Sequence, residues 1–85
     1  MTTIAKTFFL GADIFCPKRI KEELGEHYSM LEDSPIKGTF YFITDGVVLR
    51  YDWNSFEIMA YDKKVNYQIR SQLENILSIK LIEPC

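Results

Sequence analysis

Apolar and β-branched residues are concentrated in three runs between residues 39 and 61. The runs span residues 39–44, 47–53 and 56–61, and two pairs, Asp45-Gly46 and Asn54-Ser55, separate them. Asp-Gly between apolar runs is a strong signal of a β-hairpin, because both residue types tolerate the positive φ angles of a two-residue turn. The stretch therefore predicts a meander of three antiparallel strands.

The two turns also predict the register of the meander, because a two-residue turn decides which residues face each other. The first turn pairs Phe42 with Leu49. If Asn54-Ser55 is the second turn, Tyr51 pairs with Ile58.

Side chains alternate between the two faces of a sheet, so the register separates two sets of residues. The first set is expected to form the core and consists of Phe40, Phe42, Leu49, Tyr51, Trp53, Phe56, Ile58 and Ala60. The second set, which we call the open face, consists of Tyr41, Ile43, Val48, Arg50, Met59 and Tyr61. Five of these six are apolar or aromatic, whereas the solvated face of an antiparallel sheet usually carries polar side chains. The open face is therefore a candidate contact surface.

The N-terminal segment fits two structures. Residues 6–10 are β-prone and could add a strand to the sheet. Ile4, Phe8 and Phe15 also fall at helical spacing. We favour the strand, because the Thr-Phe-Phe sequence within residues 6–10 is poor helix material and Gly11 weakens a helix further.

A first helix is expected over residues 17–31. Pro17 suits the first helical position, and an apolar stripe follows at Ile20, Leu24, Tyr28 and Leu31. Gly25 is a weak point at which the helix could end early.

A second helix is expected from Asn66 to about Ser78, with Asn66 as its N-cap. Its apolar stripe consists of Ile69, Leu73, Ile76 and Leu77. Arg70 and Glu74 form an i, i+4 pair on another face. Residues 79–83 could extend this helix or form a short terminal strand.

Together these elements predict an α+β fold. We expect a three- to four-stranded antiparallel sheet, a β-meander with both helices on one face, in the order (β)-α-β-β-β-α. Two helices suffice to cover one face of such a sheet, so the open face should remain uncovered unless the N-terminal segment folds across it. An uncovered apolar face usually marks a contact site. We expect it to bind a partner protein or a second copy of the chain, with Tyr41, Tyr61 and Arg50 as anchors.

The composition fits one compact domain over residues 1–85, with 47% hydrophobic and 14% aromatic residues. No apolar run is long enough to span a bilayer, and we expect neither a signal peptide nor membrane association. With Cys16 and Cys85 as its two cysteines, the chain is not expected to form a disulfide framework. We therefore expect a cytoplasmic location.

The net charge of −2 is spread evenly along the chain, which disfavours nucleic acid as a partner. Nucleic-acid binders usually carry a basic surplus that neutralises phosphates. A run of acidic residues without Lys or Arg consists of Glu22, Glu23, Glu26, Glu32 and Asp33. It is either a solvated helix face or an anionic surface that engages a basic partner.

Motifs for catalysis or metal binding are absent from the sequence, and we expect no enzyme activity, metal or cofactor. One constellation remains as an alternative. The predicted register places Asp52 opposite Glu57, and two carboxylates at that distance could share a proton or a cation.

The element order α-β-β-β-α resembles that of double-stranded-RNA-binding domains, with Lys63-Lys64 just before the last helix. It is also similar to that of several small acidic inhibitors carried by mobile elements, some anti-CRISPR proteins among them. We favour a protein-binding inhibitor of the immunity or phage anti-defence type. The alternatives are a nucleic-acid-binding domain, or a small enzyme or subunit that uses Asp52 and Glu57.

Overall fold

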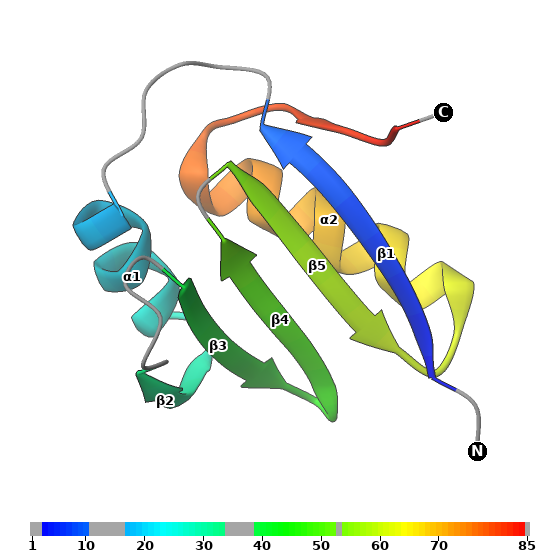
Figure 1. The fold of residues 1–85 in the computed structure, drawn as a ribbon, viewed down its shortest axis with the longest axis horizontal. Coiled ribbons are helices and arrows are strands. Elements are labelled where there is room, and N and C mark those ends of the chain that lie inside the picture. The colour runs from blue at the N-terminus through cyan, green and yellow to red at the C-terminus, as the bar shows by residue number, and fades with distance from the viewer. Residues whose placement is uncertain (1–2, 11–16, 34–38, 53, 85) are drawn as a thin grey trace.

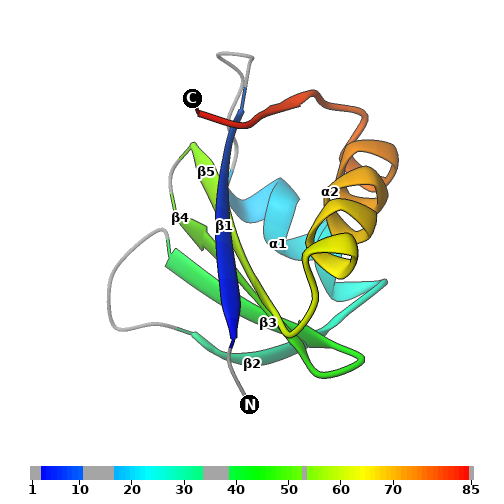
Figure 2. The ribbon, with the colours of Figure 1, turned by 90° about the vertical axis from the view of Figure 1, so that its right-hand side faces the viewer.

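The computed structural model describes residues 3–10, 17–33, 39–52 and 54–84. The strands are β1 (Ile4–Leu10), β2 (Ser29–Asp33), β3 (Thr39–Thr44), β4 (Val47–Asp52), β5 (Ser55–Ala60) and β6 (Leu81–Ile82), and the helices are α1 (Pro17–Gly25) and α2 (Lys63–Leu77). All strand pairs are antiparallel, in the order β2-β3-β4-β5-β1-β6. Both helices lie on one side of the sheet (Figures 1 and 2). The predictions for Cys16, Trp53 and Cys85 concern residues outside the described ranges.

The α+β class agrees with the sequence prediction, but the prediction of a three- to four-stranded sheet is wrong. The expected meander forms β3, β4 and β5, and the N-terminal segment forms β1 beside β5 rather than folding across the open face. β2, which the prediction lacked, extends the sheet at one edge, and β6 extends it at the other as the short terminal strand that was one alternative for residues 79–83. Both are short. β6 pairs with β1, at the other end of the described chain, whereas β2 pairs with β3, the next strand in the sequence.

The predicted helix over residues 17–31 is too long. α1 ends at Gly25, and the backbone N–H of Tyr28 donates to the carbonyl oxygen of Leu24 (2.8 Å) to close the following turn. The next residues form β2 against β3. The helical spacing was misleading because this turn still brings Tyr28 into the core, whereas Leu31 lies in β2 with 48% of its surface exposed.

The first hairpin has the predicted register, with Phe42 opposite Leu49. Asp45 and Gly46 have φ angles of 47° and 77°, which are the left-handed values that a two-residue hairpin turn requires. The local sequence thus determines this hairpin.

The second hairpin is shifted by two residues from the predicted register. Tyr51 faces Phe56 instead of Ile58. The face assignments are unchanged, because side chains repeat with a period of two along a strand. The predicted opposition of Asp52 and Glu57 is wrong.

α2 begins earlier than predicted, and its N-cap is Asp62 rather than Asn66. The carboxylate of Asp62 accepts a hydrogen bond from the backbone N–H of Lys64 (2.9 Å). The helix ends at Leu77, because Ser78 takes a left-handed conformation with a φ angle of 53°.

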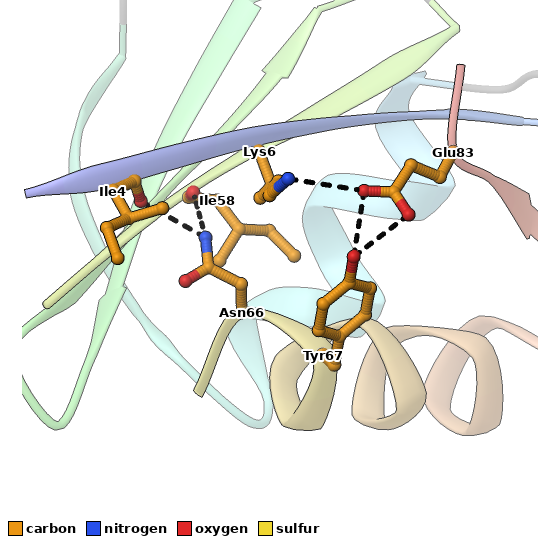
Figure 3. A network of polar contacts seen from close by, with 6 residues as sticks. All are labelled: Ile4, Lys6, Ile58, Asn66, Tyr67 and Glu83. Carbon is orange, nitrogen blue, oxygen red and sulfur yellow. Dashed lines mark hydrogen bonds and ion pairs between the residues drawn. The ribbon is translucent and has the colours of Figure 1, made fainter. Parts of the chain in front are cut away.

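Asn66 lies inside α2 and is completely buried. Its Nδ2 donates to the carbonyl oxygens of Ile4 in β1 (3.1 Å) and Ile58 in β5 (2.9 Å), as Figure 3 shows. The amide orientation is determined by these contacts, because the opposite orientation would set Oδ1 against two carbonyl oxygens. Asn66 therefore fixes the first turns of α2 on the β1–β5 pair.

The core fills the space between the sheet and the helices. Its fully buried side chains are Phe8, Leu24, Phe42, Leu49, Tyr51, Phe56, Ile58 and Leu73. Among its described residues, the predicted core set agrees with this arrangement, except that Phe40 is only partly buried.

β6 is held against α2 by the Arg70–Glu74 pair that the sequence predicted. The Nη2 of Arg70 donates to the carbonyl oxygen of Leu81 (2.8 Å). The backbone N–H of Leu81 in turn donates to Oε2 of Glu74 (3.0 Å). The Nε of Arg70 lies 3.9 Å from Oε2 of Glu74. A helix-surface ion pair thus also anchors the last strand.

Candidate functional site

The open face lies on the side of the sheet away from both helices. Figure 2 shows α1 and α2 together on one side of the strands. Tyr41 and Arg50 are cross-strand partners, as are Val48 and Met59. The structure therefore brings the predicted residues of β3, β4 and β5 together, and no described helix covers them.

Exposure within the open face is uneven. The residues on β3, β4 and β5 are half-buried by their neighbours in the sheet, whereas Tyr61, directly after β5, is 56% exposed. Among the large hydrophobic residues that the structure describes, Tyr61 has the most exposed side chain. A surface that leaves a tyrosine this exposed is suited to contact with another protein, because Tyr offers apolar area together with a polar hydroxyl.

Arg50 occupies the middle of the open face, between two carboxylates. Its Nε lies 3.4 Å from Oε1 of Glu57, its cross-strand neighbour, and its Nη1 lies 3.9 Å from Oδ2 of Asp52. Asp52 instead faces Ser55. The guanidinium side chain is 36% exposed, so solvent weakens both ion pairs. The two acids that the sequence paired with each other are thus both counter-ions of Arg50.

Two exposed hydrophobic residues on the same side of the sheet were missed by sequence reasoning. Phe9 of β1 and Ile82 of β6 are cross-strand partners and are 41% and 54% exposed. Their neighbours Phe8 and Leu81 point to the helix side and are buried. The Phe8-Phe9 doublet was a usable signal, because adjacent residues of a strand must face opposite sides.

Glu22, Glu23 and Glu26 do not join the open face. Glu22 and Glu26 are exposed in α1 and the turn after it, and Oε1 of Glu23 is 3.1 Å from Nε of Arg19. α1 lies on the helix side of the sheet. Glu32 and Asp33 belong to β2, so the five acids are divided between α1, the turn after it and β2.

A second polar cluster, which the sequence did not reveal, joins β1, α2 and the segment after β6 (Figure 3). The Tyr67 hydroxyl donates to Glu83 and lies 2.9 Å from both carboxylate oxygens. The Nζ of Lys6 is 3.6 Å from Oε2 of Glu83. The hydrogen bond to Glu83, together with desolvation and the negative charge of Glu83, raises the pKa of Tyr67.

This pKa shift can be measured. Tyr67 should lose its proton above the ordinary pH range of a tyrosine, and Glu83→Gln should move its titration back toward that range. Because the pKa of Tyr67 is higher in the folded protein, its contribution to stability is present below the ordinary tyrosine pKa and disappears as the pH rises through the folded value. Titration of the Tyr67 ring carbons by NMR in both proteins checks this, and identical curves would contradict the contact.

Other types of site find little support in the described part of the chain. No group of three or more His, Cys, Asp or Glu there could hold a metal ion. Neither described helix is long and apolar enough to cross a membrane.

Comparisons with models of protein families, with curated proteins and with solved structures found no match. Inferences about function therefore depend on the surfaces described above.

Proposed function

We propose that this chain is a non-enzymatic protein-binding module, a small acidic inhibitor that binds a larger protein through the open face and occludes it. An immunity or phage anti-defence role in the cytoplasm is the setting that we propose for it. The observation that carries the proposal is a sheet face that no described helix covers and whose side chains are mainly apolar and aromatic.

The geometry of the open face supports this function in two ways. Sheet pairing on both sides of β4 holds Tyr41 and Arg50 in fixed positions, so binding orders few side chains. Tyr and Arg are also the residue types that most often dominate binding energy at protein interfaces. The ion pairs of Arg50 with Asp52 and Glu57 keep the guanidinium in place while part of it stays accessible.

Photo-crosslinking tests which face binds. A photoreactive amino acid placed at Val48, on the open face, should crosslink to a partner captured from the native host or a competitor of that host. The same amino acid at Ser71, which is exposed on α2, is the matched control and should not crosslink. Crosslinking from Ser71 alone would contradict the proposal. A crosslink between two copies of the chain would show that the open face mediates self-association and does not bind a larger partner.

The acidic residues of α1 and the turn after it have a separate role in the proposal, which is long-range steering toward a basic partner. Replacing Glu22 and Glu26 by Lys changes the net charge from −2 to +2. Association should then slow by about tenfold at low salt and lose its salt dependence, with little change in the dissociation rate. Stopped-flow measurements at several salt concentrations check this. If the association rates were unchanged, Glu22 and Glu26 would have no steering role and would simply be solvated surface residues.

A further inference from the structure

The outer edge of β1 is only partly occupied. β1 pairs with β5 from Ile4 to Phe9, but β6 pairs with β1 only at Phe9 and Leu10. Within the described residues, no strand pairs with the outer edge of β1 before Phe9. Figure 1 shows β1 as the last long strand on this side of the sheet.

The backbone groups that face this edge can be assigned. The N–H of Leu10 donates to the carbonyl oxygen of Asn54 (2.8 Å), so Leu10 directs its backbone toward the β5 side. Successive residues of a strand direct their N–H and C=O groups to opposite sides. Phe9, Thr7 and Ala5 therefore face the outer edge, and Ile82 pairs with the first of them. No described strand pairs with the outward N–H and C=O groups of Ala5 and Thr7.

The segment that follows β6 lies near this edge but does not pair with Thr7 and Ala5. Continued by one residue, the register of β6 would place Glu83 opposite Phe8, and the Glu83 carboxylate contacts Lys6 and Tyr67 (Figure 3). The same register would place Pro84 opposite Thr7, and proline has no N–H to donate. β6 therefore cannot continue the ladder along Thr7 and Ala5.

The charged side chains near the outer edge of β1 indicate which kind of strand could pair with it. Lys6 keeps 31% of its side chain exposed. Lys63 and Lys64 are exposed in the first turn of α2, which Asn66 holds beside Ile4. The carboxylates of Asp62 and Glu83 lie nearby and offset two of these three positive charges, so one net positive charge remains beside the edge. Additional carboxylates would be attracted to this edge.

We propose that the outer edge of β1 binds an extended acidic segment of a partner protein, which adds as a strand beside Ala5 and Thr7. This binding site is distinct from the open face. A second copy of the chain fits poorly, because the twofold pairing of Ala5 with Thr7 would place Lys6 opposite Lys6 of the copy. A Lys in an exposed edge strand is a common protection against such self-pairing.

Two labelled heptapeptides test the proposal on the unchanged protein. One alternates Thr or Val with Glu, and the other has Lys in place of Glu. The acidic peptide, added at millimolar concentration, should shift the backbone amide NMR signals of Ala5 and Thr7 and should bind at least about tenfold more tightly than the basic one. No shift at these amides, or equal binding of both peptides, would overturn the proposal.

A pair of variants tests the role of the backbone. Thr7→Pro removes an outward N–H and should weaken binding of the acidic peptide at least about tenfold, whereas Thr7→Ala keeps the N–H and should bind as the parent does. Both should fold, because proline is tolerated where the N–H of an edge strand faces solvent. Unfolding of Thr7→Pro alone would show that the fold uses this N–H and would overturn the assignment. If sedimentation showed that the protein is a dimer and that Thr7→Pro dissociates it, the edge would bind a second copy of the chain, and the proposal of an acidic segment would be overturned.

Discussion

Replacement of Asn66 by Asp should lower the free energy of unfolding by about 3–5 kcal/mol, measured by urea denaturation at neutral pH. Asn66 is the buried donor that joins α2 to two strands through the carbonyl oxygens of Ile4 and Ile58. An ionised Asp has no donor and would place a buried negative charge against two carbonyl oxygens. For a domain of this size, that loss is a large part of the total stability.

A second substitution separates the lost hydrogen bonds from the buried charge. Asn66→Ala removes the two bonds but adds no charge, so it should cost about 2 kcal/mol and less than Asn66→Asp. Asn75→Asp is the matched control, because it makes the same chemical change at an exposed position of the same helix. It should change stability by less than about 1 kcal/mol. Equal effects of Asp at positions 66 and 75 would contradict the anchoring role of Asn66.

The double variant Tyr41→Ala with Tyr61→Ala should abolish partner binding while the fold remains intact. Interface tyrosines often contribute about 1–2 kcal/mol each or more, so the loss of both should weaken binding by about 100-fold or more. Neither side chain belongs to the buried core, and Tyr61 is largely exposed. The melting temperature should therefore change little.

The control for this variant lies on the other side of the sheet. Gln68→Ala with Ser71→Ala alters two exposed positions of α2 and should leave binding unchanged. Binding constants and melting temperatures of both double variants separate a binding defect from a folding defect. If the tyrosine variant unfolded or still bound at full strength, the open face would not be the docking surface.

The sequence predicted those parts of the fold that depend on local signals. The Asp45-Gly46 turn determined the first hairpin, and the apolar stripe through Ile69 and Leu73 identified α2. The predicted register of the second hairpin was wrong by two residues, because Asn-Ser is a weaker signal for a two-residue turn than Asp-Gly. The face assignments on β3, β4 and β5 still agree with the structure, since a shift of two residues keeps each side chain on its face.

The parts that could not be predicted are the two short edge strands, of which β6 pairs with the distant β1 and β2 with the neighbouring β3. β6 has only two residues, and β2 follows a helix whose apolar spacing continues past its end at Gly25. The Lys6–Glu83 contact and the exposed Phe9–Ile82 pair both depend on the position of β6. The spacing of apolar residues in the sequence gave no indication of where β6 lies in the sheet.

The identity of Asn66 illustrates a related limit. Asn is a common N-cap, so its place before an apolar stripe suggested a cap. A buried donor to β1 and β5 can be recognised only after the strands are paired. The cap residue itself, Asp62, is of the same preferred class and stands four positions earlier.

Methyl NMR of the complex with the captured partner tests the central claim most directly. Ile43, Val48 and Met59 carry methyl groups on the open face, and Leu24 and Leu73 carry buried methyl groups on the helix side. When partner is added, the first three signals should shift or broaden, while the two leucine signals should keep their positions. Partner binding that left the signals of Ile43, Val48 and Met59 unchanged would contradict the assignment of the open face as the docking surface.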